Sequence, residues 1–323
     1  MASLLDDPRR PLFSRVNQAT LPPGSVFKVI TAIAGMEAGE IDPLEPFDCQ
    51  GYFAKPDRER CAIYRHFGVG HGPVDLEQAL AESCNTYFFA VAGRVGGDSI
   101  ADWGRRFGLG APTQTDLPFE ASGQVPSPSV AARSGDDWYP GSTRQLAIGQ
   151  GSLTVTPLQV ARLMAAIAND GWLVQPRFVR PATPQLDSFS GTAESIALVS
   201  FVDSAENDDG QRPIRVNGLS PATLAHVRRG LEATVEHPRG TGRAARLPQV
   251  RVAGKTGTAE IGGNRPDHAW FAGYVPADRP RIAFVVVIEQ GGSGGRVAAP
   301  VARAYVSQLL QAGVISPTPA RPE

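Results

Sequence analysis

Three apolar segments in the last third of the chain limit the possible folds most strongly. They cover residues 250–261, 268–276 and 281–290 and are rich in the apolar and small side chains of buried strands. Turn residues such as those of 276–280 separate them. Strands joined by short turns run in opposite directions. The sequence therefore predicts an antiparallel sheet near the C-terminus.

Helical spacing of apolar residues marks the rest of the chain. From Val26 to Met36 they recur on one face, and Gly39 is a suitable C-cap. We expect further helices at 75–82, 86–96, 99–109, 157–169, 220–235 and 298–311, irregular structure at 40–73 and 110–145, and a short strand at 199–204 within the polar segment 182–218.

Length and charge narrow the possible functions. The chain has 323 residues, of which 42% are hydrophobic, and a net charge of −1. We expect one unit over 1–323, with an α/β lobe from about 1–40 and 215–315 and a mainly helical lobe at about 41–214. The charge lacks the basic excess of a nucleic-acid binder. No apolar run reaches the roughly 20 residues of a membrane helix.

Lysine is rare in this sequence. Of the 31 basic residues only three, Lys28, Lys55 and Lys255, are lysine, which leaves 28 arginines. Arginine stays protonated in proteins, whereas a desolvated lysine can become a neutral base. Codon usage alone could explain this preference for arginine over lysine. The alternative is that lysine remains where arginine cannot replace it.

Lys28 has a serine one helical turn before it. Ser25 and Lys28 are three residues apart at the start of the first expected helix, so both side chains lie on the same face. A serine hydroxyl is a weak nucleophile until a neighbouring base removes its proton. Lys28 can act as that base if burial or a second cation, such as Lys255, lowers its pKa.

Two further motifs follow along the chain. Ser83 and Asn85 flank Cys84 at a break between two helices, where Ser83 can relay a proton and Asn85 can bind a substrate amide. Residues Lys255–Thr258 lie on an expected strand, where a peptide can add as a further strand. There Lys255, with Thr256 or Thr258, attracts a carboxylate, and Gly257 leaves room for the ligand.

Each motif alone is weak, because serine and asparagine are common at helix ends and glycine is common at bulges. Together, in this order and at these separations, they match the signature of penicillin-binding proteins and class A β-lactamases. The flanking segments 21–39, 71–89, 138–171, 252–260 and 268–276 closely resemble the class B penicillin-binding proteins, most of all the elongation-type branch. The likeness covers nearly all of 8–312.

The resemblance implies an α+β penicillin-binding transpeptidase fold, with an antiparallel sheet flanked by helices and an all-helical lobe. It implies a peptidoglycan D,D-transpeptidase in which Ser25 attacks a D-Ala-D-Ala stem peptide and an acceptor amine resolves the acyl-enzyme. Lys28, Ser83, Asn85 and Lys255 are the other expected catalytic residues. Thr256, Gly257 and Thr258 are expected to bind substrate. The amide groups of Ser25 and Thr258 are expected to form the oxyanion hole.

The resemblance also implies partners and a location. The expected partners are stem peptides, β-lactams and, for a full-length protein, glycan-polymerising and elongation-complex membrane proteins, with no nucleic acid. The expected location is the extracytoplasmic face of the cell membrane. The membrane anchor, the pedestal domain and the sheet segments that precede Ser25 in the family are not found in this sequence, so we expect a catalytic fragment.

Cysteine and histidine gather ahead of the Ser83 motif. Cys49, Cys61, His66 and His71 offer ligands that suit zinc, but no tight Cys-x-x-Cys pair is present. A disulfide between Cys49 and Cys61, or plain packing, accounts for these residues equally well, so no metal ligand is assigned. We expect no cofactor, and Cys84 is expected to be a small buried residue.

Two other functions compete. A D,D-carboxypeptidase or β-lactamase has the same fold, but no segment clearly supplies the glutamate that activates water in class A β-lactamases. A β-lactam sensor would keep Ser25 and Lys28, so the sequence alone does not exclude it.

Overall fold

The computed structural model describes residue 4 and residues 6–8, 10–179, 214–263 and 265–318. The strand expected at 199–204 lies outside the described residues. The helices are α2 Lys28–Glu37, α3 Ala62–Phe67, α4 Leu76–Ala81, α5 Asn85–Val95, α6 Gly97–Arg106, α7 Pro128–Ser134, α8 Pro140–Ala147, α9 Pro157–Ala168, α10 Pro221–Glu236 and α11 Ala299–Gln311. None of these helices is long and apolar enough to cross a membrane.

The expected antiparallel sheet is confirmed. Strands β5 (Ala253–Ala259), β6 (His268–Val275) and β7 (Ile282–Ile288) pair in the order β5-β6-β7. Successive side chains of β6 face opposite sides, as a strand requires. Trp270 and Tyr274 pack into one hydrophobic core and Phe271 into a second one. Both faces of the sheet are therefore covered, which explains why all of β6 is buried.

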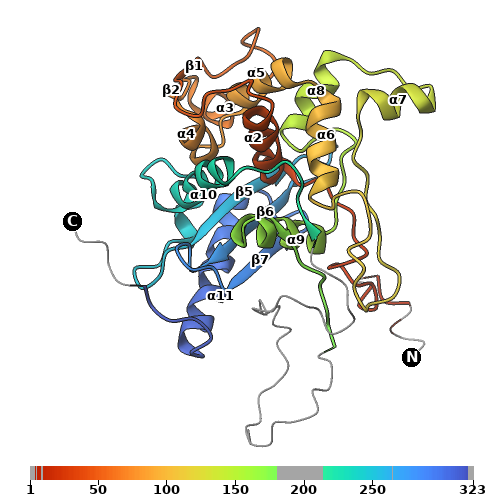
Figure 1. Cartoon of the computed structure of the whole chain (residues 1–323), viewed down its shortest axis with the longest axis vertical. Helices are drawn as coiled ribbons and strands as arrows, with labels where there is room; N and C mark the ends of the chain where they lie inside the picture. Colours follow the sequence, from red (N-terminus) through yellow and green to blue (C-terminus); the bar gives the residue numbers. More distant parts are fainter. Residues whose placement is uncertain (1–3, 5, 9, 180–213, 264, 319–323) are drawn as a thin grey trace, which may run out of the picture.

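Helices cover the two faces (Figure 1). α10 packs against β5, and α9 against β6 and β7, while α11 covers the opposite face with the second core. Helices α3 to α8 lie around α2 and beyond it, away from α11. The division of the sequence into lobes put α9 in the mainly helical lobe, but α9 lies on the sheet. The architecture is the expected α+β arrangement.

Local sequence signals explain most helix boundaries. Asp75 caps α4 and Thr156 caps α9, each in a reciprocal capping box with the glutamine three residues later. Ser220 caps α10 in front of a proline. The irregular structure expected at 110–145 is wrong in part, because α7 and α8 form there. Likewise 40–73 contains α3 and the strand β1 (Phe47–Cys49), which pairs with β2 (Gly72–Val74).

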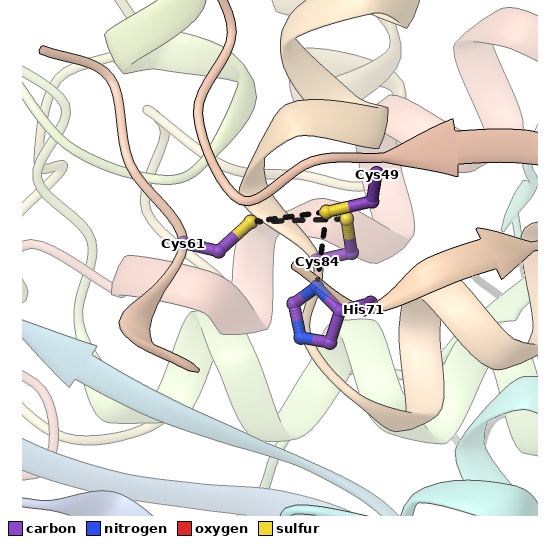
Figure 2. A group of neighbouring side chains, drawn as sticks. All are labelled: Cys49, Cys61, His71 and Cys84. Carbon is purple, nitrogen blue, oxygen red and sulfur yellow. Dashed lines mark hydrogen bonds between the residues drawn. The ribbon is translucent and has the colours of Figure 1, made fainter. Parts of the chain in front are cut away.

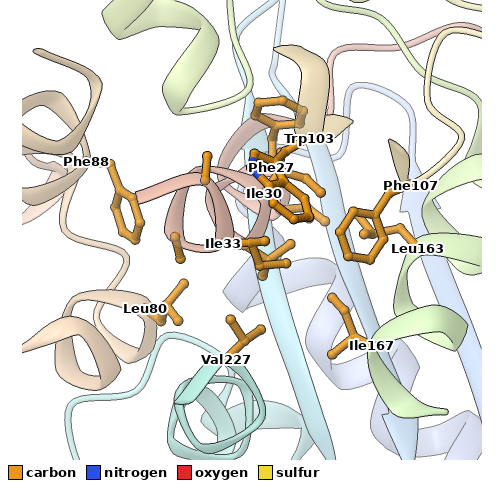
Figure 3. Close-up of a cluster of buried hydrophobic side chains, with 14 of the residues drawn as sticks. Phe27, Ile30, Ile33, Leu80, Phe88, Trp103, Phe107, Leu163, Ile167 and Val227 are labelled. Carbon is orange, nitrogen blue, oxygen red and sulfur yellow. The ribbon is translucent and has the colours of Figure 1, made fainter. Parts of the chain in front are cut away.

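Helix α2 runs through the centre of the first core (Figure 3). Phe27, Ile30 and Ile33 are fully buried. Burial of each side chain contributes about 1.5–3 kcal/mol relative to an exposed one. Their surroundings come from five helices, through the buried residues Leu80, Phe88, Trp103, Phe107, Leu163, Ile167 and Val227. Such a position restrains the helix start that carries Ser25 and Lys28.

Candidate active site

The Ser25 side chain lies in a short turn that leads into α2. Residues Gly24–Phe27 form the 3-10 helix η1, and Lys28 begins α2. Gly24 has a φ of +55°, a left-handed conformation that glycine adopts at little cost. Ser25 is partly exposed, whereas Val26 and Phe27 are buried. The expected position of Ser25 at the opening of a buried helix is thus found.

The Ser25 turn lies against strand β5. A Cβ atom on Gly24 would be 2.7 Å from the carbonyl oxygen of Thr258, and one on Gly257 would be 2.7 Å from that of Pro23. Real side chains do not fit at such separations. Glycine at position 257 is therefore required by the approach of the turn. This reason differs from the expected one, in which Gly257 leaves space for a ligand.

Lys28 is fully buried and bonded to the second motif. Its Nζ atom donates to the carbonyl oxygen of Ser83 at 2.7 Å and to Oδ1 of Asn85 at 2.6 Å, and lies 3.2 Å from Oγ of Ser83. Among the described contacts none joins Nζ directly to the Ser25 hydroxyl. A neutral amine has two hydrogens and one lone pair. The two carbonyl-type oxygens take the hydrogens, which leaves the lone pair for a hydroxyl.

Burial sets the proton affinity of this amine. Desolvation lowers the pKa of Lys28 to about 8, against the opposing effect of the Cys61, Cys84 and Cys49 thiols. The shift from 10.5 corresponds to about 3 kcal/mol between the two protonation states. About one Lys28 side chain in ten is then neutral at pH 7. The sequence left two causes open, burial or a second cation, and burial is the one found.

The Ser83 motif forms a tight break between α4 and α5. Ser83 has a φ of +57°, an uncommon conformation for a residue other than glycine. Asn85 begins α5, and its Nδ2 donates to the carbonyl oxygen of Arg60 at 2.9 Å. Both ends of the Asn85 amide are thus bonded within the protein. These two hydrogen bonds hold the Asn85 side chain against Lys28.

Lys255 is also fully buried, in the middle of β5. The only described hydrogen bond of its side chain runs from Nζ to the carbonyl oxygen of Thr256 at 3.3 Å. Desolvation holds the pKa of Lys255 well below its usual range, and the nearby Lys28 charge lowers it further. The two lysines therefore lie within electrostatic reach of each other.

The two threonines of the third motif differ in exposure. Thr256 is 6% exposed, and its hydroxyl lies 2.7 Å from that of Thr241. Thr258 is exposed, and its Oγ1 accepts a hydrogen bond from the amide of Gly294 at 3.2 Å. Because Oγ1 accepts this bond, the proton of the Thr258 hydroxyl remains available to an anion.

Three cysteines and a histidine meet behind the Ser83 motif (Figure 2). The ligand atoms of Cys49, Cys61, His71 and Cys84 all lie within 4.8 Å of one another, and all four residues are buried. Cys84 lies between Ser83 and Asn85 and was expected only to fill space. His66, which the sequence grouped with the other candidates, is exposed and outside the cluster.

The donor set fits a tetrahedral zinc ion. Zinc–sulfur bonds of about 2.3 Å at tetrahedral angles place two sulfur atoms about 3.8 Å apart. Cys61 Sγ lies 3.8 Å from Cys49 Sγ and 3.9 Å from Cys84 Sγ. The three cysteines form no disulfide. Hydrogen bonds from Cys61 and Cys84 lower the pKa of the Cys49 thiol, which favours the thiolate that a metal binds.

The three motifs thus converge around Lys28. Lys28 bonds to Ser83 and Asn85, and the Ser25 turn lies against the strand of Lys255. The sequence did not predict that the Arg60 carbonyl binds Asn85 or that the Thr241 hydroxyl binds Thr256. It also did not predict that Cys84 belongs to the cysteine cluster. No local pattern marks the first two, because their partners are far away in the sequence.

Comparison with known sequences identifies the family. The penicillin binding protein transpeptidase domain matches residues 3–307. The peptidoglycan D,D-transpeptidase MrdA of Acinetobacter baumannii is 33% identical over 92% of this chain and 44% of its own length. The peptidoglycan D,D-transpeptidase PbpA of Mycolicibacterium smegmatis is 33% identical over 96% of this chain and 59% of its own length. This chain spans about half the length of the curated relatives it matches.

Solved structures agree with the sequence comparison. PBP2 of Pseudomonas aeruginosa, in complex with WCK 5153, is 34% identical with a TM-score of 0.78, over 98% of this chain and 66% of that chain. PBP2 of Helicobacter pylori, solved with MreC, is 26% identical with a TM-score of 0.80, over 97% of this chain and 54% of that chain. The chain therefore belongs to the penicillin-binding protein transpeptidase family, in its class B branch.

Proposed function

We propose that this chain is the catalytic part of a peptidoglycan D,D-transpeptidase that forms an acyl-enzyme on Ser25. One observation carries the proposal: a fully buried lysine, one helical turn from that serine, has its hydrogens taken by two carbonyl-type oxygens. This arrangement supports a neutral amine that accepts a proton. The names of the relatives support the same reaction.

In the proposed acylation, Ser25 Oγ bonds to the carbonyl carbon of the penultimate D-Ala, and the peptide C–N bond breaks. The hydroxyl proton passes to Lys28, and a proton returns through Ser83 to the nitrogen of the departing D-Ala. Asn85 holds Lys28 and Ser83 in place. An acceptor amine then attacks the ester, and Ser25 regains its proton as the new peptide bond forms.

The substrate is proposed to lie along β5. Amide groups of Ser25 and Thr258 would bind the oxyanion, and the close approach of the Ser25 turn to β5 supports this pairing. Lys255 and the available Thr258 proton would bind the carboxylate of the donor peptide. Thr256, whose hydroxyl is bonded to Thr241, would complete this part of the site with the backbone of Gly257.

The cysteine cluster is proposed to hold zinc. Cys49, Cys61, His71 and Cys84 would be its ligands, by the donor set and the sulfur separations described above. A zinc ion with four protein ligands has no open position and acts as a structural element. Its contribution would be to fix the backbone at Cys84, and with it the positions of Ser83 and Asn85.

Partners and location follow from the relatives. H. pylori PBP2 was solved in complex with MreC, and another similar structure comes from a peptidoglycan synthase complex of polymerisation and crosslinking. We propose that the full-length protein works with such membrane partners at the extracytoplasmic face of the cell membrane. Its substrates would be stem peptides, and β-lactams would acylate Ser25 as mimics of the donor.

Intact-mass measurement after incubation with a penicillin tests the function. We expect one β-lactam adduct per chain that persists for hours, and none with Ser25→Ala. Rapid hydrolysis of the penicillin would favour the β-lactamase alternative. Release of D-Ala without crosslinking, in the presence of an amine acceptor, would favour the carboxypeptidase. An adduct with neither activity toward stem peptides would favour the sensor.

A further inference from the structure

A short segment after α10 connects the second and third motifs. It covers residues 238–242, which we call the strap. The amide of Thr241 donates to the carbonyl oxygen of Ala81 at 3.0 Å, and its Oγ1 lies 3.2 Å from the same oxygen. Its Oγ1 also lies 2.7 Å from Oγ1 of Thr256. Ala81 ends α4 two residues before Ser83, and Thr256 follows Lys255 in β5.

The strap backbone is held against the end of α10. The amide of Gly242 donates to the carbonyl oxygen of Thr234 at 2.9 Å, and a Cβ atom on Gly240 would collide with that same oxygen. On its other side, a Cβ atom on Gly295 would lie 2.5 Å from the carbonyl oxygen of Thr241. The strap therefore lies between α10 and the segment before α11, and Thr241 has little freedom to move.

A second contact binds the strap to the Ser83 motif. The Glu82 side chain is only 3% exposed and pairs with Arg239 at 2.8 Å. Arg239 also donates to the carbonyl oxygen of His71 at 3.3 Å. A carboxylate at this depth requires a partner. The two residues before Ser83 are thus both held by the strap.

The hydroxyl groups can be assigned a direction. A backbone carbonyl only accepts, and each threonine hydroxyl has one proton to donate. All groups are satisfied when Thr256 donates to Thr241 and Thr241 donates to Ala81. A continuous hydrogen-bonded path then joins the strand of Lys255 to the helix end that precedes Ser83. This path also restricts the rotation of the Thr256 side chain.

We propose that Thr241 is a positioning residue that fixes the separation between the Ser83 motif and the Lys255 strand. The inference rests on the proposed acylation of Ser25, since it assigns Thr241 a part in that reaction. Displacement of reacting groups by about 1 Å can cost a hundredfold in rate. Loss of one hydroxyl in the path should therefore slow acylation without loss of the fold.

The test measures acylation by a fluorescent penicillin over a range of concentrations, so that the rate constant of acylation is separated from binding. Thr241→Val keeps the shape and removes the hydroxyl, and Thr241→Ser restores it. We expect about tenfold slower acylation in Thr241→Val. We expect Thr241→Ser within about twofold of the wild type, and similar melting temperatures for all three.

A double-mutant cycle with Thr256→Val separates positioning from general packing. If the two hydroxyls act through one bond, the double variant is no slower than the slower single variant. Multiplicative effects, equal losses in Thr241→Ser and Thr241→Val, or wild-type rates in Thr241→Val would each overturn the inference. A wild-type chain that forms no adduct at Ser25 would instead overturn the proposed function itself. The positioning role of Thr241 would then fall with it.

Discussion

Lys28 and Lys255 are equally buried, but their surroundings differ. Lys28 lies within hydrogen-bond distance of three oxygen atoms of Ser83 and Asn85. Within the described part of the chain, Lys255 bonds to a single carbonyl oxygen, that of Thr256, at 3.3 Å. Burial lowers the pKa of Lys28 to about 8 and holds that of Lys255 well below its usual range. The two lysines have the same burial but different hydrogen-bond partners.

The difference indicates separate tasks. Burial lowers the pKa of both lysines, and the charge of Lys28 adds to the effect on Lys255. Lys28 titrates close to neutral pH, where a general base is most effective. The Lys255 amine has more hydrogens than acceptors among the described residues, and a substrate carboxylate would supply further acceptors. The following predictions test this division.

Replacement of Lys28 should have the largest effect. We expect Lys28→Arg and Lys28→Met to reduce penicillin acylation by at least about a thousandfold, because neither side chain can accept the Ser25 proton. Stopped-flow or gel-based labelling measures the rate. Lys55→Arg, which changes the lysine outside the candidate site, is the matched control and should behave as the wild type. Labelling that survives Lys28→Arg would contradict the base assignment.

Replacement of Lys255 should cost less. We expect Lys255→Met to reduce acylation by about a hundredfold, the magnitude found when one charged or hydrogen-bonding partner is removed from a site. The loss should appear mainly in the half-saturation concentration, because Lys255 is proposed to bind a carboxylate. A loss as large as that in Lys28→Met, confined to the maximal rate, would show that the two lysines share one task.

Loss of the cysteine cluster should disturb Ser83 and Asn85, which contact Lys28. It should not change the residues around Lys255. We expect about one zinc per purified chain by elemental analysis. Cys61→Ser should lower both zinc content and melting temperature, and slow acylation by about tenfold. His66→Gln, outside the cluster, is the control. A chain without zinc whose Cys61→Ser variant melts like the wild type would refute the metal centre.

The pH dependence should be the smallest effect. Only neutral Lys28 accepts a proton, so acylation should increase with pH through a midpoint of about 8, about tenfold between pH 7 and 9. Burial is the cause found for the low pKa of Lys28, so Lys255→Met should leave the midpoint unchanged. A midpoint that moves by a unit in that variant would mean that the charge of Lys255 contributes to the pKa of Lys28.

Much of the fold was predictable because its signals are local. The capped helices at Asp75, Thr156 and Ser220 and the three strands of the sheet follow from residues close to one another in sequence. Helices α7 and α8 were missed because both are short, begin at proline and lie in a segment rich in glycine and serine. Such helices depend on packing more than on their own propensity.

In the candidate site too, some features were predictable from the sequence and others were not. The helix-face argument pointed to Ser25 and Lys28, because a nucleophile and its base must lie close together. The resemblance to a known family signature added Ser83, Asn85 and Lys255–Thr258 as candidates. Residue types alone did not predict that Cys84 joins Cys49, Cys61 and His71, nor that Gly257 admits the Ser25 turn. These contacts join residues tens to hundreds of positions apart.

The sequence by itself determined which groups can react, since the chemistry of serine, lysine and cysteine does not depend on the fold. Tertiary structure alone decided how each group behaves. Among the described residues it placed three oxygen atoms within hydrogen-bond distance of Lys28 and one near Lys255, and it buried both lysines completely. The pKa of a buried amine depends on the oxygen and charged atoms around it, and distant segments of the chain supply those atoms.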